Sequence, residues 1–152
     1  MSTQRRVLLA RPHPFIVSGM KGLLEQSGFE PTPIASLAEL ASTDPAGVHG
    51  VVISTSITAA EPTEKVLAAV RRFSARLPVI IATLLEFETT RKALAHTILP
   101  LVPDAVFVPA TAATLARADL GQPNLFVVLR KVEVDDVGRK SAVQAILERH
   151  FR

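Results

Sequence analysis

The sequence has no cysteine, no tryptophan and no tyrosine. Without cysteine the chain forms no disulfide, no thiolate metal site and no cysteine nucleophile, and this absence favours a cytoplasmic protein. Without tyrosine and tryptophan it lacks two of the rings that stack on nucleic-acid bases. The seven glycines form no phosphate-binding loop of the Walker or Rossmann kind. These absences exclude thiol chemistry and the common nucleotide-binding loops.

Long hydrophobic runs are also missing. The longest apolar stretch, residues 77–85, is far shorter than the roughly 20 residues that span a bilayer, and Pro78 interrupts it. The first six residues are polar and lack the apolar core of a signal peptide. We therefore expect a cytoplasmic protein that does not associate with a membrane.

The composition predicts one globular domain. The chain has 152 residues, 48% of them hydrophobic and 20% charged, which is a folded and not a disordered balance. The net charge is only +3, and basic residues gather near both ends of the chain. Because no dense basic run occurs, a solvated surface is favoured over a nucleic-acid partner.

Apolar runs alternate with helical patterns along the whole chain. The predicted strands cover residues 6–10, 30–34, 50–53, 78–83, 105–108 and 125–134. Helical patterns begin near Pro14, Ser36, Pro62, Glu86, Thr111 and Asp135 or Asp136. This alternation predicts an α/β fold with a doubly wound, mostly parallel sheet. Function is expected where such strands end, at residues 10–12, 54–56, 83–85 and 108–110.

The opening segment, VLLARPHPFIVSGMKGLLEQSGF over residues 7–29, resembles the start of response-regulator receiver domains. It is most similar to the branch that usually carries a C-terminal helix-turn-helix. More loosely, VVIST at 51–55, PVIIAT at 78–83 and DAVFVP at 104–109 resemble the third, fourth and fifth receiver strands. The resemblance implies a flavodoxin-like (βα)5 domain over residues 1–119. Residues 120–152 are then a C-terminal strand and helix packed on the same domain.

The departures from the receiver pattern concern its phosphorylation pocket, where acidic residues hold Mg²⁺ and an aspartate accepts the phosphoryl group. Six positions fall on that pocket: Arg11, Pro12, Ser54, Thr55, Thr83 and Pro109. Arg11 and Pro12 replace the acidic pair, Thr55 (or Ser54, one residue earlier) replaces the phosphoacceptor, and Pro109 replaces the lysine. Neither a guanidinium nor a proline side chain can bind Mg²⁺. We therefore expect a pseudo-receiver that is not phosphorylated, is not an enzyme and holds no metal or cofactor.

A second alignment stays open for the fifth receiver strand. Residues 125–131 could form it, with Lys131 as the family lysine and residues 99–124 as an insertion. Long insertions inside compact domains are uncommon, which favours the first alignment. Neither alignment restores the acidic residues.

Two interpretations also stay open for Arg11. Together with Thr55 and Thr83 it could form an anion-binding pocket. Alternatively its guanidinium fills the space of the missing metal ion and pairs with Glu86 or Glu88, which is the favoured reading.

The four histidines, at positions 13, 49, 96 and 150, are scattered and indicate neither a metal site nor a catalytic set. In the last helix Val143, Ile146 and Leu147 form an apolar stripe, which by default faces the core and otherwise supplies a dimer surface. Three functions follow as hypotheses. The first is a phosphorylation-independent signalling protein that binds a protein partner, with a homodimer expected. The others are a sensor of a small anionic ligand or nucleotide and a nucleic-acid-associated regulator.

Overall fold

The computed structural model describes residues 5–10, 14–34, 37–42, 47–54, 63–73 and 76–151. Its strands are β1 (Arg5–Ala10), β2 (Phe29–Ile34), β3 (Val48–Ser54), β4 (Val79–Thr83), β5 (Val106–Pro109) and β6 (Leu125–Arg130). Its α-helices are α1 (Pro14–Gln26), α2 (Leu37–Ser42), α3 (Thr63–Phe73), α4 (Phe87–Ile98), α5 (Lys131–Asp135) and α6 (Lys140–His150). Two 3-10 turns, η1 (Ala112–Ala116) and η2 (Val137–Arg139), complete the order.

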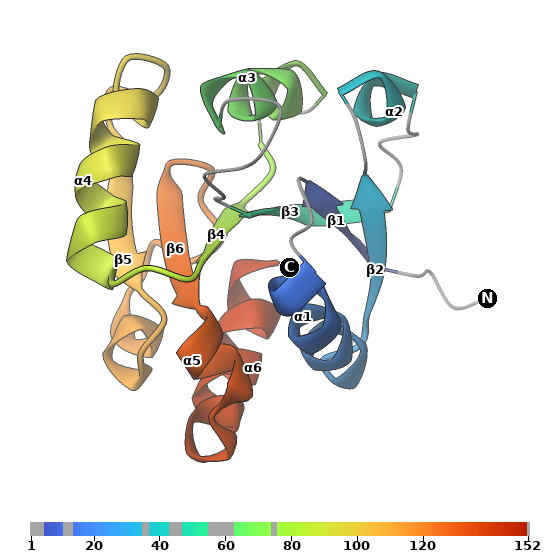
Figure 1. The fold of residues 1–152 in the computed structure, drawn as a ribbon, viewed down its shortest axis with the longest axis vertical. Helices are drawn as coiled ribbons and strands as arrows, with labels where there is room; N and C mark the ends of the chain where they lie inside the picture. The colour runs from blue at the N-terminus through green and yellow to red at the C-terminus, as the bar shows by residue number, and fades with distance from the viewer. Residues whose placement is uncertain are drawn as a thin grey trace.

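The strands form one six-stranded sheet in which every neighbouring pair is parallel (Figure 1). Their order is β2-β1-β3-β4-β6-β5. The doubly wound parallel α/β fold predicted from the sequence is therefore confirmed.

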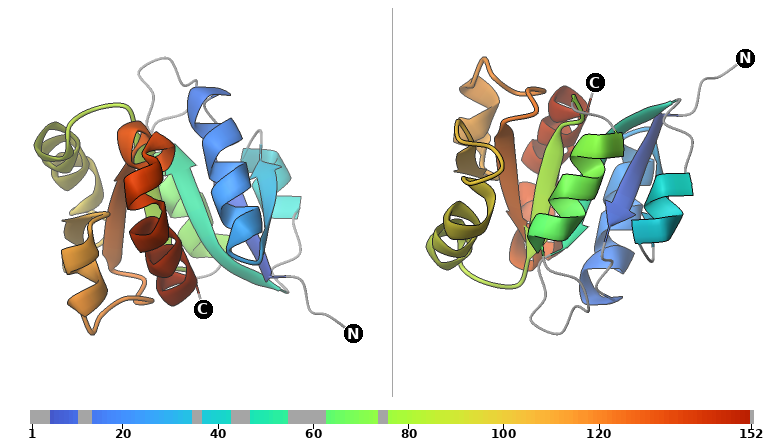
Figure 2. Two further views of the ribbon diagram at one scale, coloured as in Figure 1. Left: turned by 90° about the horizontal axis from the view of Figure 1, so that it is seen from below. Right: turned by 90° about the horizontal axis from the view of Figure 1, so that it is seen from above.

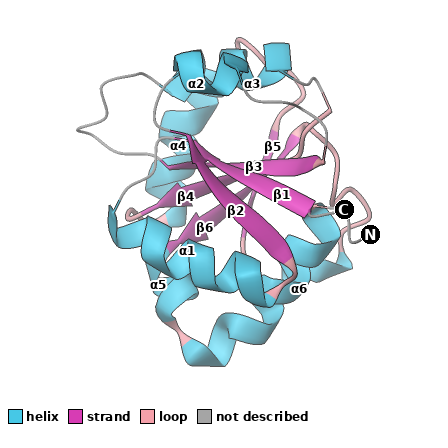
Figure 3. Ribbon diagram, turned by 90° about the vertical axis from the view of Figure 1, so that its right-hand side faces the viewer, coloured by secondary structure: helices cyan, strands magenta, loops and turns pink. Residues whose placement is uncertain are grey.

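Helices cover both faces of the sheet (Figures 2 and 3). Alternate residues of each strand point to opposite faces, so the inner strands supply two hydrophobic clusters. One contains Val7, Leu9, Val52, Val127 and Leu129 and lies under α1 and α6. The other contains Leu8, Val51, Ile53, Phe126 and Val128 and lies under α2, α3 and α4. Burial on both faces explains why the central strands are apolar throughout. No helix among the described residues is both long and apolar enough to cross a bilayer.

The lateral order of the last two strands corrects the first alignment. We expected residues 105–108 to stand beside the fourth strand, as the fifth strand of a 2-1-3-4-5 sheet does. Instead β6 pairs with β4, and β5 pairs with the far side of β6. The five residues Leu125 to Leu129 are all buried, which suits an interior strand, whereas β5 is short and ends in a proline. The alternative placement of the fifth strand at 125–131 matches the structure, with β5 inserted before it.

The sixth strand is also shorter than predicted. It ends at Arg130, and residues 131–135 form α5 instead of continuing the strand to residue 134. The carboxylate of Glu133 accepts a hydrogen bond from the Arg130 backbone N–H at 2.9 Å, which turns the chain into the helix.

The last residues of the described chain are fixed to the sheet. Phe151 is fully buried and lies directly over Gly50 of β3. A Cβ atom at Gly50 would stand 2.1 Å from Cδ1 of the Phe151 ring, so only glycine leaves room for it. The ring also meets Phe29 edge-on at a centroid distance of 6.0 Å. This packing joins the end of α6 to β2 and β3.

Both edge strands contain proline. Pro31 and Pro33 lie in β2, and Pro109 ends β5. Val106 and Ala110 donate their N–H groups towards β6, so the alternation of a strand turns the nitrogen of Pro109 to the outer edge. A proline nitrogen carries no hydrogen, so the outer edge of β5 has no donor at Pro109.

Candidate functional site

The carboxyl ends of the strands meet at one edge of the sheet, where ligands bind in folds of this class. Thr83 ends β4 and lies opposite Arg130, which ends β6. Ser54 ends β3 next to Ala82. The predicted pocket residues Arg11, Pro12 and Thr55 lie outside the described residues. The structure therefore places Thr83 and Arg130 together at this edge and leaves the anion pocket of Arg11, Thr55 and Thr83 a prediction.

The hydroxyl of Thr83 is fully committed to internal hydrogen bonds. Its side chain is buried, and its Oγ1 accepts the Leu85 backbone N–H at 3.1 Å. The Oγ1 atoms of Thr83 and Thr90 are 3.2 Å apart, and Thr90 Oγ1 donates its hydrogen to the Glu86 carbonyl at 2.9 Å. The single hydroxyl hydrogen of Thr90 already bonds the Glu86 carbonyl, so Thr83 must donate the hydrogen bond that joins the two hydroxyls. The Thr83 hydroxyl thus has no hydrogen left for a ligand in this conformation.

Among the described residues, Arg130 places a positive charge at this edge and forms ion pairs with two glutamates. Its Nε lies 3.3 Å from the carboxylate of Glu133, whose side chain is 2% exposed. Its Nη1 lies 3.0 Å from the carboxylate of Glu86, whose side chain is 81% exposed. The buried carboxylate also accepts the Arg130 backbone N–H, so it satisfies a main-chain and a side-chain donor together. The guanidinium is neutralised from within the chain.

The remaining predicted positions of the pocket are separated from this centre. Pro109, expected at the family lysine, ends β5 opposite Val128 and is kept from β4 by the whole of β6. This expectation is wrong because β5 is the edge strand. Lys131, the other candidate for the family lysine, begins α5 and pairs with Asp135. The residue opposite Thr83 in the sheet is Arg130.

The glutamates expected as partners of Arg11 both have other partners. Glu86 pairs with Arg130, and Glu88 pairs with Arg91 at 2.8 Å. The hydrogen bond from Arg91 lowers the pKa of the Glu88 carboxyl. Pairing of Arg11 with either glutamate stays a prediction.

Exposed apolar side chains lie beside the Thr83–Arg130 pair. Leu84 and Leu85 follow β4 and are 50% and 45% exposed, and Val132 of α5 is 53% exposed. The Glu86–Arg130 ion pair joins these two segments. We call Leu84, Leu85 and Val132 the apolar patch. Exposed apolar side chains that gather at one place indicate a contact surface.

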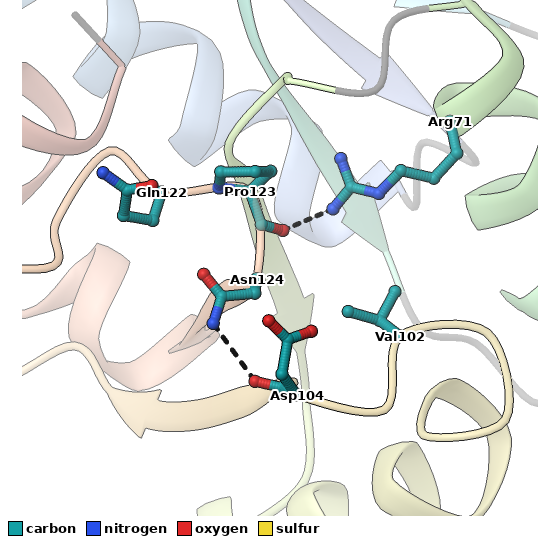
Figure 4. A pocket seen from close by; sticks show the side chains of 6 residues that line it. All are labelled: Arg71, Val102, Asp104, Gln122, Pro123 and Asn124. Carbon is teal, nitrogen blue, oxygen red and sulfur yellow. Dashed lines mark hydrogen bonds between the residues drawn. The ribbon is translucent and has the colours of Figure 1, made fainter.

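A hollow of about 310 Å³ lies at the opposite end of the sheet, where β4, β5 and β6 begin (Figure 4). It is lined by Arg71, Val102, Asp104, Gln122, Pro123 and Asn124. Arg71 donates to the backbone carbonyls of Leu77, at 3.0 Å, and of Pro123. Burial lowers the pKa of its guanidinium. Arg71 thus ties α3 to the segments that precede β4 and β6.

Sequence reasoning missed Glu133 and Thr90. A glutamate three residues after the last strand residue is the spacing by which a side chain caps the start of a helix, and this signal was available at Arg130 and Glu133. Nothing in the sequence singles out Thr90, because its role depends on how α4 lies against β4. Within the described part of the chain, no three histidine or acidic side chains are grouped as a metal site would need.

Comparisons with known proteins bear on the fold. No known protein family and no curated protein matches the sequence. Two solved structures share the fold. A response regulator receiver protein from Sinorhizobium medicae WSM419 has a TM-score of 0.56 at 14% identity, covering 97% of each chain. A response regulator receiver domain protein from Clostridium thermocellum has a TM-score of 0.56 at 17% identity, covering 95% of this chain and 93% of its own. The chain therefore has a receiver-like fold.

Proposed function

We propose that this chain is an atypical response-regulator protein that signals through protein–protein contacts and takes up no phosphoryl group. The observation that carries the proposal is the state of the carboxyl edge, where the Thr83 hydroxyl and the Arg130 guanidinium are both satisfied by the chain itself. A phosphoryl group would have to compete with a buried hydrogen-bond chain and with two carboxylates. Removing such internal partners leaves buried polar groups unsatisfied, which is costly.

The donor types at this edge do not fit a magnesium ion. Mg²⁺ takes oxygen ligands, preferably carboxylates, in octahedral geometry. The sequence offers Arg11 and Pro12 after β1 and a threonine after β3. The carboxylates of Glu86 and Glu133 serve Arg130. By sequence, the resemblance therefore assigns the basic residue Arg11 to a position where the receiver family has an acidic one.

The test of phosphorylation independence is incubation with acetyl phosphate and Mg²⁺, followed by intact-mass measurement. The expected result is an unchanged mass, with an active receiver domain phosphorylated in the same mixture as the control. A stoichiometric, acid-labile phosphate on this chain would overturn the proposal.

The protein contact is assigned to the apolar patch, and the partner that we propose is a second copy of the chain. The apolar stripe of α6 does not serve, because Val143, Ile146 and Leu147 are buried in the core as the default interpretation predicted. Sedimentation velocity of the wild type is expected to show a dimer that Leu84→Glu and Val132→Glu dissociate. Leu101→Glu is the matched control, because Leu101 is 46% exposed and follows α4 at the opposite end of the sheet. A monomeric wild type, or a dimer that all three variants keep, would contradict this assignment.

The charge distribution weighs against the nucleic-acid hypothesis. Three basic side chains from the end of β6 onwards have acidic partners within the chain: Arg130 with Glu133, Lys131 with Asp135 and Arg139 with Asp136. Neutralised cations release few counterions on binding a phosphate backbone. The anion-sensor hypothesis is weakened in the same way by the committed hydroxyl of Thr83.

A further inference from the structure

His150 joins three parts of the chain that are distant in sequence. It ends α6, and its side chain is fully buried. Its Nδ1 lies 3.0 Å from the backbone nitrogen of Gly121, in the segment between β5 and β6. Its Nε2 lies 3.1 Å from the carbonyl oxygen of Val79, at the start of β4. The imidazole thus links α6 to the segment between β5 and β6 and to the central strand β4.

The two partners fix the protonation state of the ring. A carbonyl oxygen only accepts, so Nε2 must carry a hydrogen and donate it to Val79. A backbone N–H only donates, so Nδ1 must present its lone pair to Gly121. The ring is therefore neutral with its hydrogen on Nε2. A second proton on Nδ1 would set two donors against each other in a buried place, which is costly.

Other contacts also hold the segment between β5 and β6, because Leu115 and Leu120 pack against the hydrophobic cluster that contains Val143, Ile146 and Leu147 of α6. Arg149 donates from Nη1 to the Leu115 carbonyl at 2.6 Å. Gly121 has a φ of +95°, a backbone conformation that other residues rarely adopt. It lies close to the carbonyls of Arg149 and His150. The hydrogen bond from Gly121 to His150 is partly buried, whereas the one from Arg149 to Leu115 is exposed.

The charged groups around the ring do not offset the free-energy cost of protonating it. Asp119, in the same segment, is the carboxylate that acts on His150, and it already pairs with Arg117 at 2.8 Å. Arg149 adds a positive charge next to it on α6, and Glu148 of α6 is exposed. Val79 and Gly121 offer backbone groups. Burial lowers the pKa of His150 to about 4, and the bond to Val79 and the charge of Asp119 oppose this shift only in part.

We propose that His150 is a pH-operated latch. Its neutral ring fastens residues 117–124 to α6 and β4, and its protonation in mild acid releases that segment while the sheet stays folded. The released segment includes Gln122, Pro123 and Asn124, which line the hollow of Figure 4. Opening of the latch therefore also reshapes the hollow.

The direction of the pH effect follows from the proton count. A histidine in the open segment regains its ordinary pKa of about 6.5. Between about pH 6.5 and pH 4, His150 is protonated in the open state and still neutral in the closed state. The equilibrium constant for opening should therefore rise on the order of 50-fold between pH 7.5 and pH 4.5. Above pH 7 it should not change.

Amide hydrogen exchange, corrected for the intrinsic pH dependence of the amides, tests the latch. In the wild type, exchange in residues 117–124 should accelerate on the order of 50-fold over that range relative to β3 and β4. In His150→Gln it should not, because a glutamine offers an acceptor and a donor that do not titrate. His96→Gln, at an exposed histidine, is the matched control and should behave as the wild type does.

Three results would overturn the latch. They are exchange of residues 117–124 that does not depend on pH in the wild type, the same pH dependence in His150→Gln, and acceleration of β3 and β4 to the same extent. If His150→Gln does not fold, NMR of the wild-type imidazole decides. The latch requires the Nε2–H form and a pKa below 5, and an Nδ1–H form or an ordinary pKa refutes it.

Discussion

Replacing Phe151 by alanine should lower the free energy of unfolding by about 4 kcal/mol, since Phe→Ala changes in cores cost about 3–5 kcal/mol. The loss should not fall below the middle of that range, because the surroundings cannot fill the space of the lost ring. It lies over Gly50, which has no side chain to move inwards, and against Phe29 in an edge-on pair. Such a pair contributes about 0.5–1.5 kcal/mol beyond burial.

Urea unfolding followed by far-UV circular dichroism gives the free energy directly. The same loss should lower the melting temperature by roughly 8–16 °C, at about 2–4 °C per kcal/mol for a domain of this size. Leu101→Ala is the control, because Leu101 is exposed and lies outside the apolar patch, so its truncation should change stability by less than about 0.5 kcal/mol.

A double-mutant cycle tests whether the ring and Gly50 act on each other. Gly50→Ala should cost about 2–3 kcal/mol in the wild type, because the new Cβ overlaps the ring. In the Phe151→Ala background the overlap is gone, and the cost should fall below about 1 kcal/mol. A loss of under 1 kcal/mol for Phe151→Ala, or an equal cost of Gly50→Ala in both backgrounds, would refute the reasoning.

Three further predictions concern buried polar groups. Glu133→Ala should lower the free energy of unfolding by about 2 kcal/mol in the same urea assay, because it leaves the backbone N–H and the guanidinium of Arg130 without their buried acceptor, and a loss below 0.5 kcal/mol would contradict the network. Thr90→Val should cost about 1–2 kcal/mol, because it removes the acceptor of the Thr83 hydroxyl, and an unchanged stability would show that this hydroxyl is free to turn to a ligand. The lowered pKa of His150 should make the chain progressively less stable from pH 6.5 to about pH 4, by up to about 3 kcal/mol, and a His150→Gln variant with the same pH profile would assign the loss to other groups.

Much of the fold follows from the sequence because the periodicity of apolar residues is local. The run before Thr83 and the helix with Leu94 and Ile98 lie where the pattern predicts them. The length of β6 was overestimated because Val132 and Val134 continue a β-branched pattern, whereas a hydrogen bond to Glu133 ends the strand.

The lateral order of strands is not a local property, and the sequence specified it only indirectly. The unbroken apolar run of residues 125–129 already indicated an interior strand, and Pro109 already indicated an edge. The low frequency of long insertions inside compact domains nevertheless favours the first alignment, which places the fifth receiver strand at residues 105–108. Contacts such as that of Phe151 with Gly50 join residues about a hundred positions apart, and no spacing rule predicts them.

The prolines of β2 and β5 limit how copies of this protein can meet. Amyloid fibrils and strand-swapped assemblies grow when an outer strand offers a row of amide hydrogens to another chain. Here Pro31 and Pro33 each remove an amide hydrogen from the edge strand β2, and Pro109 removes one from the edge strand β5. These prolines should therefore make it harder for a second folded copy to extend the sheet by adding a strand at either edge.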